Sequence, residues 1–316
     1  MKYLWQFTHD DLDGGGCAVV AAHLFPGHKH SVEYCAYHGP KGINSLLLKF
    51  LENYQPMEGE EHTLLITDIL PRVDVCDTIN LHSKKFARVT AYDHHDTTLW
   101  ARNNEKYPWI FHGGVCGARL LYESVPTDIP LHNFVYEVDA WDRWLLESHH
   151  RVSGETLNLI YREIGSVEFY RSFAENIMAD SNSWLSKLGV HLREKRDLWI
   201  RSELLRLDEV GKCFVDVLGR KALILLGGEY ISEFADAILK AHVDIDYVLF
   251  LLPASNSISL RSRKNSEVDV GQIAKGFPGG GGHQSAAGFE YPMRETLFVG
   301  AVGALQYRFS VTPGEV

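Results

Sequence analysis

The stretch Ala91-Tyr92-Asp93-His94-His95-Asp96 follows residues 86–90, whose length and composition are typical of a buried strand. It places three side chains that can bind a metal in a row at the end of that strand. A lone histidine there would usually be an ordinary packed residue. The triplet alone favours a functional and a structural interpretation equally. The choice depends on what stands at the ends of the other strands.

Strands alternate with helices along the first 100 residues of the chain. We expect the following elements: strands at residues 3–9, 31–37, 63–67 and 87–92, and helices at residues 17–24 and 43–54. This alternation predicts an α/β fold with a doubly wound, mainly parallel sheet. Parallel strands end at one edge of such a sheet, and open α/β sheets carry their sites there.

The length of 316 residues suits two domains better than one average core. Residues 183–209 mix apolar positions with many charges, which is typical of a long, solvated connecting helix. A second α/β segment follows, with expected strands at residues 213–218, 221–226, 247–252 and 257–260 and a helix at 232–241. We therefore expect a catalytic domain at residues 1–180, a helical linker at 181–211 and a smaller substrate-binding α/β domain at 212–316.

The composition excludes several classes of protein. Hydrophobic residues make up 45% and charged residues 23% of the chain, so neither a disordered nor a fibrous protein is indicated. The net charge of −10 disfavours a protein that holds long duplex nucleic acid through a positive field. Five scattered cysteines without a CxxC pair read as reduced core residues. The reduced cysteines and the lack of a signal-peptide core predict a cytoplasmic protein, and apolar runs of only strand length predict no membrane span.

Four ionisable residues in five positions end the first expected strand, in His9-Asp10-Asp11-Leu12-Asp13. His9, Asp11 and Asp13 are spaced by two, so on an extended backbone their side chains share one face. Carboxylates with an occasional imidazole are the ligands that suit hard divalent cations. We expect a Gly-rich turn over residues 10–16, and a plain polar turn is the alternative explanation.

Three further aspartates follow apolar stretches. Asp68 ends the third expected strand; alone it would be explained as a helix N-cap or turn residue, but beside the other clusters it could bridge two cations. Asp139 and Asp142 follow a helical apolar stretch. A surface ion pair with Arg143 explains Asp142 at least as well as metal ligation does.

The C-terminal segment carries two candidate anion-binding stretches. Gly279-Gly280-Gly281-Gly282-His283 allows backbone N–H groups to approach a ligand closely, and we expect a short helix of small residues after it. A flexible linker is the alternative. Ser259-Leu260-Arg261-Ser262-Arg263-Lys264 supplies a cationic patch at a strand end, for which solvated surface charge is the competing explanation.

In chain order, five motifs resemble the DHH phosphoesterase superfamily with its DHH-associated C-terminal domain: His9-x-Asp11-x-Asp13-Gly14, Asp68, Asp93-His94-His95, Ser259-Leu260-Arg261-Ser262 and Gly280-Gly281-Gly282-His283. Each motif is weak or moderate alone, but the ordered set spans nearly the whole chain and is specific. The resemblance implies an N-terminal domain that holds two divalent cations, usually Mn²⁺, with Mg²⁺ or Co²⁺ as alternatives. It also implies a C-terminal domain that closes over the substrate across a cleft.

The resemblance assigns roles residue by residue. One metal would be held by His9, Asp11 and Asp68, and the other by Asp13, Asp68 and His94, with Asp139 completing the second set. We favour Asp139 slightly over Asp142, because it directly follows the apolar stretch. His95 would face the scissile phosphate and Asp93 would orient the histidines. The substrate-binding positions would be Arg261, Ser262, Gly280, Gly281, Gly282 and His283.

Two cations about 3.5–4 Å apart can activate a water and clamp phosphate oxygens, so no serine or cysteine nucleophile is needed. Compact length and net acidity favour a nanoRNase-like exonuclease that hydrolyses short oligonucleotides or linear dinucleotides to mononucleotides. The alternatives are a RecJ-like single-strand exonuclease, a cyclic-dinucleotide phosphodiesterase, a pyrophosphatase, or a catalytically inactive binding subunit. The sequence leaves the oligomeric state open, with a homodimer as one candidate.

Overall fold

The computed structural model describes residues 1–37, 39–125, 130–145, 147–176, 183–216 and 219–291. The chain divides into two compact units between Glu194 and Lys195, within the helix α7 (Ser183–Leu205). The domain boundaries that we expected near residues 180 and 211 stay predictions. None of the described helices is long and apolar enough to cross a membrane.

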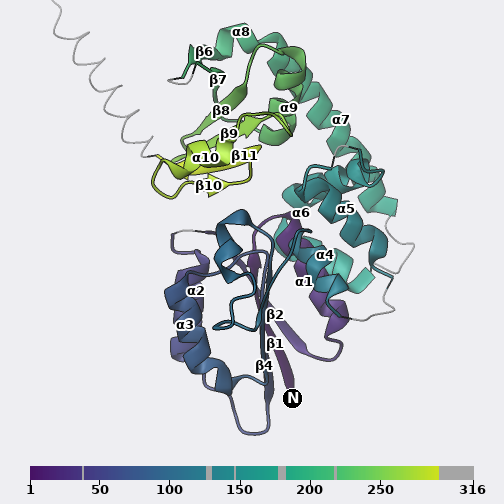
Figure 1. Cartoon of the computed structure of the whole chain (residues 1–316). Helices are drawn as coiled ribbons and strands as arrows, with labels where there is room; N and C mark the ends of the chain where they lie inside the picture. Colours follow the sequence, from purple (N-terminus) through teal and green to yellow (C-terminus); the bar gives the residue numbers. More distant parts are fainter. Residues whose placement is uncertain (38, 126–129, 146, 177–182, 217–218, 292–316) are drawn as a thin grey trace, which may run out of the picture. The chain divides into compact units, whose positions relative to one another are not determined.

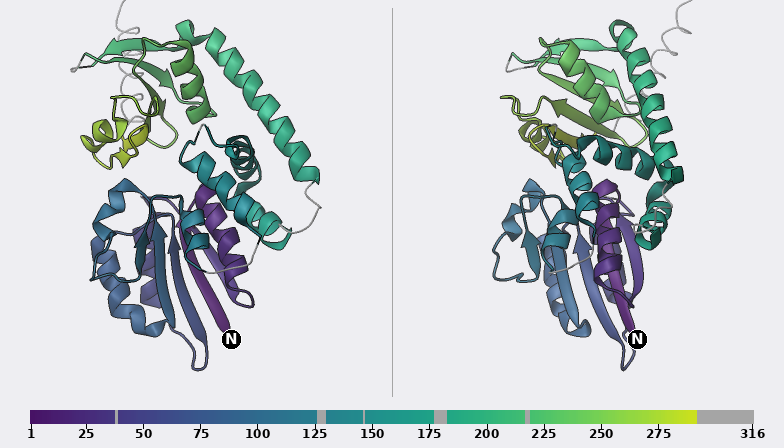
Figure 2. Two further views of the ribbon diagram at one scale, coloured as in Figure 1. Left: turned by 45° about the vertical axis from the view of Figure 1, so that its right-hand side comes forward. Right: turned by 90° about the vertical axis from the view of Figure 1, so that its right-hand side faces the viewer.

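The first unit is built on a five-stranded sheet with the order β2-β1-β3-β4-β5, and every neighbouring pair is parallel. Its strands are β1 (Lys2–His9), β2 (Lys29–Cys35), β3 (Glu61–Thr67), β4 (Arg88–Asp93) and β5 (Ile110–His112). The predicted α/β fold with a mainly parallel sheet is thereby confirmed. Figure 2 shows these strands side by side, in purple and blue.

Helices cover both faces of this sheet (Figure 1). They are α1 (Leu12–Leu24), α2 (Ile43–Asn53), α3 (Val73–His82), α4 (Gly117–Glu123), α5 (His132–Asp142) and α6 (Arg151–Asn176), with short 3₁₀ turns at Ser83–Lys85 and Asp96–Ala101. Apolar residues of α2 and α3 form one core with β1, β3 and β4. Helix α1 is buried over its first ten residues and packs with α4 and α6.

The second unit contains a mixed six-stranded sheet with the order β10-β11-β9-β8-β7-β6. Its elements are α8 (Leu207–Val210), β6 (Lys212–Val215), β7 (Lys221–Leu226), α9 (Ile231–Ala241), β8 (Tyr247–Leu252), β9 (Ser257–Ser262), α10 (Val270–Lys275), β10 (Gly281–Gly282) and β11 (Ala286–Glu290). Among the described strands of this second sheet, only β7 and β8 pair in parallel, and the other neighbouring pairs are antiparallel. This unit therefore differs from the first in both size and topology.

Several local predictions were wrong. The Gly-rich stretch at residues 14–16 lies inside α1 and forms no turn; at Gly14 a Cβ would stand 1.9 Å from the carbonyl oxygen of His9, so only glycine allows this approach. The short helix expected after Gly282 is the strand β11. The edge strand β5 was not expected, and Cys213 is exposed instead of lying in the core.

Candidate metal centre

The carboxyl ends of β1, β3 and β4 meet at one edge of the first sheet. Thr67 of β3 is in register with Thr8 of β1 and with Tyr92 of β4. The next residue along each strand is a candidate site residue: His9, Asp68 and Asp93. The backbone of Asp68 adopts a φ of 58°, in the left-handed region. A non-glycine residue pays on the order of 1 kcal/mol there, and such residues concentrate at functional sites.

The first turn of α1 supplies two more carboxylates. Asp11 is the N-cap of the helix, and its side chain accepts a hydrogen bond from the backbone N–H of Gly14 at 3.0 Å. Asp13 is the second residue of the helix and accepts backbone N–H bonds from Gly117 (2.5 Å) and Ala118 (2.8 Å) at the start of α4. Two helix ends therefore fix both carboxylates beside the sheet edge.

Two groups of potential ligand atoms share Asp68. In one group, Nδ1 of His9 lies 2.7 Å from Asp11 Oδ2 and 3.8 Å from Asp68 Oδ2. In the other, Nε2 of His94 lies 3.2 Å from Asp68 Oδ1 and 3.6 Å from Asp13 Oδ2. The two oxygens of Asp68 thus face different groups, which is the arrangement expected of a bridging carboxylate.

The structure corrects our preference between the two aspartates of α5. Asp142 Oδ2 lies 3.5 Å from His94 Nε2 and forms a possible ligand set with His94 and Asp13. Asp139 points elsewhere: its carboxylate accepts bonds from the backbone N–H of Cys116 (2.9 Å) and from Arg119 (3.0 Å). The Arg143 guanidinium also approaches Asp139, at 3.4 Å, instead of pairing with Asp142 as we had considered. The geometry therefore favours Asp142.

The donor set fits divalent cations. Asp68 is buried, and neither of its carboxylate oxygens accepts a hydrogen bond from any described residue; the same holds for Oδ2 of Asp142. Burial and the charge of Asp13 raise the pKa of Asp68 well above its usual range, and they raise that of Asp142 likewise. Buried carboxylates are normally paired or bind metal. Oxygen and imidazole donors in this number suit Mn²⁺, Mg²⁺ or Co²⁺.

His95 is held in place by Asp93. Asp93 Oδ1 accepts the backbone N–H of His94 (2.7 Å) and of His95 (3.2 Å), and lies 2.7 Å from Nδ1 of the His95 ring. Burial opposes ionisation of Asp93, but the hydrogen bond from His95 and the charges of His95 and His94 together outweigh it and lower the pKa of Asp93 to about 2. Burial lowers the pKa of His95, but Asp93 and further carboxylates raise it to about 9. This contact agrees with the orienting role expected for Asp93.

Tyr37 is a neighbour of the site that the sequence did not reveal. Its hydroxyl lies 3.0 Å from Nε2 of His95, and its ring centroid is 4.8 Å from that of His9. A single tyrosine after a strand belongs to no spacing pattern. Only its place at the end of β2, next to β1 in the sheet, could have suggested it.

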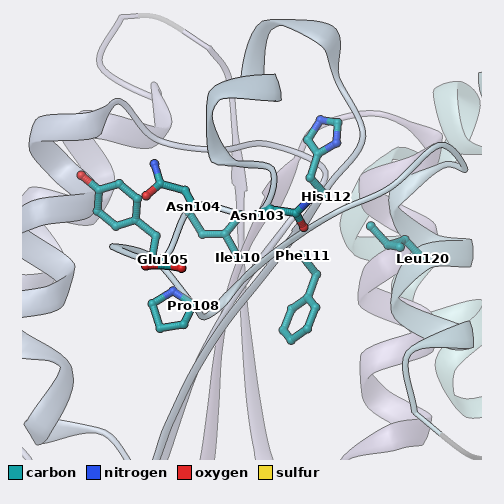
Figure 3. Close-up of a pocket in the computed structure, with 9 residues that line it drawn as sticks. Asn103, Asn104, Glu105, Pro108, Ile110, Phe111, His112 and Leu120 are labelled. Atoms are coloured by element: carbon teal, nitrogen blue, oxygen red, sulfur yellow. The ribbon is translucent and has the colours of Figure 1, made fainter.

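A pocket of about 380 Å³ lies beside the edge strand β5 (Figure 3). Its lining includes the exposed Phe111, Leu120 of α4 and His112. Nε2 of His112 lies 3.0 Å from the carbonyl oxygen of His95, so this ring braces the backbone of the site. The pocket contains none of the residues that we predicted to bind metal or substrate.

In the second unit, Arg261 and Ser262 lie at the end of β9. The Arg261 guanidinium is held by the hydroxyls of Ser259 (2.7 Å) and Ser232 (3.2 Å). Ser262 is buried, and its hydroxyl donates to the carbonyl oxygen of Val268 at 3.0 Å. Arg263, which we expected in the cationic patch, bonds backbone carbonyls instead.

The side chain of Arg263 donates to three backbone carbonyls at and just beyond the end of α9, those of Leu239 (2.7 Å), His242 (2.9 Å) and Ile245 (2.7 Å). Charged donors at a helix C-terminus are a common means of stabilising it. Arg263 is therefore a capping residue, and the cationic patch that we expected is smaller than the sequence indicated.

The Gly-rich stretch forms a hairpin next to Arg261. Strand β11 pairs with β10 through Gly281↔Gly288 and with β9 through Ala286↔Arg261. At Gly280 a Cβ would stand 1.8 Å from the carbonyl oxygen of Ala274, and Gly282 has a φ of 134°. The backbone geometry itself thus requires these two glycines. His283 closes the hairpin, with its N–H donating to the Ala286 carbonyl at 2.8 Å.

The fold and the strand-end ligand sets support the resemblance to the DHH phosphoesterase superfamily that the sequence showed. No family model matches the chain. The chain is 27% identical over 299 residues to the oligoribonuclease NrnB of Bacillus subtilis, an alignment that covers 89% of this chain and 71% of that protein.

Two solved structures share the fold. One is the DHH domain of a protein assigned to a family of ribosomal proteins, with a TM-score of 0.58, 13% identity, and coverage of 96% of this chain and 86% of that one. The other is the exonuclease RecJ bound to manganese, with a TM-score of 0.55, 16% identity, and coverage of 99% and 92%. The likeness extends over nearly the whole length of all three chains.

Proposed function

We propose that this chain is a two-metal-dependent phosphodiesterase that hydrolyses short oligonucleotides or linear dinucleotides to mononucleotides. The observation that carries the proposal is the pair of ligand groups that share Asp68, next to a histidine that a buried aspartate orients. The similarity to an oligoribonuclease supports the substrate class. The manganese in the RecJ structure supports Mn²⁺ as the metal.

In this proposal, His9, Asp11 and Asp68 would hold one cation. Asp13, His94 and Asp142 would hold the other, together with Asp68, whose Oδ1 lies 3.2 Å from Nε2 of His94. Bound divalent cations polarise phosphoryl oxygens and lower the pKa of water enough for attack near neutral pH. The carboxylates are fixed before any ligand binds, since two helix ends and the left-handed backbone at Asp68 hold them. Such preorganisation avoids reorganisation during the reaction.

His95 is the residue that we assign to the scissile phosphate. Nδ1 of His95 bonds Asp93, so Nε2 is the ring nitrogen directed away from Asp93. A histidine in this setting can donate a hydrogen bond to a phosphoryl oxygen and stabilise the charge that develops in the transition state. Asp93 acts on the reaction only through His95.

Arg261, Ser262, Gly280, Gly281, Gly282 and His283 are the proposed substrate-binding positions of the second unit. Support comes from the pairing of β9 with β11, which brings the arginine and the Gly-rich hairpin together within that unit. Two serine hydroxyls hold the Arg261 guanidinium, which is suited to a phosphate group. Ser262 would act by fixing the end of the strand, since its hydroxyl bonds a carbonyl oxygen.

Net acidity favours a short substrate over a long strand, because the net charge of −10 leaves only a small cationic patch for phosphates. An inactive binding subunit is disfavoured because the metal-ligand residues are all present. Cytoplasmic location and a homodimer, which the sequence suggested, stay predictions.

Hydrolysis of a labelled dinucleotide with Mn²⁺ tests the proposal. We expect turnover by the wild type and a loss of at least about 100-fold in Asp68→Ala, since even indirect supports of a metal site are worth about 10–100-fold. Asp74→Ala is the matched control, because Asp74 is an exposed aspartate of α3 paired with Arg72. Equal turnover in wild type and Asp68→Ala, or none in either, would contradict the proposal. A rate that rose steeply with strand length would favour a RecJ-like exonuclease instead.

A further inference from the structure

The loop after β2 brings Tyr37 to the sheet edge that carries the metal centre. Strand β2 pairs in parallel with β1, and Cys35 is in register with His9. The loop then closes on itself: the N–H of Ala36 donates to the carbonyl of Lys41 at 2.8 Å, and the N–H of Ile43 donates to the carbonyl of Ala36 at 2.9 Å. These bonds fix the start of the loop, so Tyr37 leaves the sheet in a defined direction.

Tyr37 contacts two residues of the site from this position. Its hydroxyl lies 3.0 Å from Nε2 of His95, and its ring packs against the ring of His9 at 4.8 Å between centroids, tilted by 54°. The rings of Tyr37 and His95 meet edge to face, at 5.9 Å and 86°. Because 38% of Tyr37 is exposed, the residue borders both the site and solvent.

The hydrogen bond between Tyr37 and His95 persists in either protonation state of the imidazole. Asp93 accepts two backbone N–H bonds besides the ring, so Nδ1 of His95 is the donor to it. In the neutral imidazole, Nε2 then accepts the proton of the phenol. In the imidazolium, Nε2–H donates to the phenol oxygen instead. Burial and the charges of Asp68 and Asp93 raise the pKa of Tyr37 well above its usual range, so the phenol keeps its proton.

We propose that Tyr37 is a positioning residue for His95, which it holds at Nε2 while Asp93 holds it at Nδ1. One hydrogen bond leaves an imidazole free to tilt about the bonded nitrogen, and a second bond at the opposite nitrogen removes that freedom. Nε2 is the atom that we assign to the scissile phosphate, so in the substrate complex its one N–H is shared between the phenol oxygen and a phosphoryl oxygen, and the phenol keeps the ring in that direction. This inference rests on the proposed function.

Tyr37→Phe removes the hydroxyl and keeps the ring that packs on His9. A net hydrogen bond of ordinary strength corresponds to about a three- to tenfold change in rate. We therefore expect kcat for a dinucleotide to fall by about three- to tenfold, while KM and the affinity for Mn²⁺ stay within about twofold. Tyr3→Phe is the matched control, because the Tyr3 hydroxyl bonds Glu60 at the amino end of β1 and should leave kcat unchanged.

A double-mutant cycle separates positioning from an independent role. If Tyr37 acts through His95, Tyr37→Phe should change kcat by less than about twofold in a His95→Ala background, because coupled residues are not additive. The same loss in both backgrounds would overturn the inference. So would unchanged kcat in the single variant beside an active wild type. A wild type without turnover would instead overturn the proposed function.

The nitrogen signals of the histidine side chains provide a readout without metal or substrate. In ¹⁵N-labelled, metal-free protein, Tyr37→Phe should shift the Nε2 signal of His95, which is assigned by its loss in His95→Ala. Tyr3→Phe should leave this signal in place. An Nε2 signal that is identical in wild type and Tyr37→Phe would show that the phenol does not hold this nitrogen, and would overturn the inference whatever the activity.

Discussion

Replacing Asp142 and Asp139 by asparagine should have opposite consequences, although the two residues lie three positions apart on α5. Asp142→Asn removes one of several negative charges from a site in which its carboxylate lies within 4.8 Å of a ligand atom of Asp13. At an effective dielectric constant of about 20, one such repulsion is worth about 3.5 kcal/mol at that separation, and protons shared among the carboxylates reduce it. We expect the metal-free protein to gain about 1–2 kcal/mol of stability and to lose at least about tenfold in Mn²⁺ affinity.

Asp139→Asn should act in the other direction. Its carboxylate is buried and pairs with Arg119 at 3.0 Å, so the substitution removes the buried one of two counter-charges of this guanidinium and leaves Glu123, at 2.7 Å, as the other. Arg119 is 22% exposed, and solvent offsets part of this loss. We expect a destabilisation of about 1–3 kcal/mol with Mn²⁺ binding preserved. Urea unfolding in EDTA measures the first quantity and calorimetric titration with Mn²⁺ the second. Loss of a cation in Asp139→Asn but not in Asp142→Asn would refute this assignment.

Three further perturbations test other parts of the structure. Burial lowers the pKa of His30 to about 4 from 6.5. As the pH falls, His30 is therefore protonated first in the unfolded chain, and up to about 3 kcal/mol of stability is lost between pH 6.5 and 4. His30→Gln should diminish this loss in urea unfolding measured at several pH values. Arg263→Ala should destabilise the second unit by about 2–3 kcal/mol in chemical denaturation without altering Mn²⁺ binding. Gly14→Ala should abolish soluble expression or the native circular-dichroism spectrum, because its Cβ would overlap a backbone carbonyl.

The strand-end residues were predictable because one physical rule places them. Parallel strands end at a common edge, so His9, Asp68 and the Asp93-His94-His95 triplet had to meet if the apolar runs before them were strands. The run at residues 64–67 is buried throughout, as the central position of β3 requires. The fold class and most of the candidate ligand residues therefore followed from hydrophobic pattern and motif order.

The sequence could not show which way each side chain of a helix points or which residues from other elements it contacts. Asp139 and Asp142 face different neighbours, and only the packing of α5 shows that Arg119, from another helix, neutralises Asp139. Gly14 and its two following glycines suggested a turn, since glycine disfavours helices. Close contacts override that preference here: a Cβ at Gly15 would stand 2.5 Å from the ring of Tyr161. Tyr37 belongs to no motif, and only its place after β2 could have suggested it.

The central claim is that Asp68 joins two cation sites in one catalytic centre. Its most direct test is the number of Mn²⁺ ions bound per chain, measured by calorimetry on metal-free protein and compared with dinucleotide hydrolysis at each point of the titration. We predict two equivalents for the wild type, with turnover appearing only as the second is filled, and at most one equivalent without turnover for Asp68→Ala. Full activity in EDTA, or two equivalents bound by Asp68→Ala, would contradict the claim.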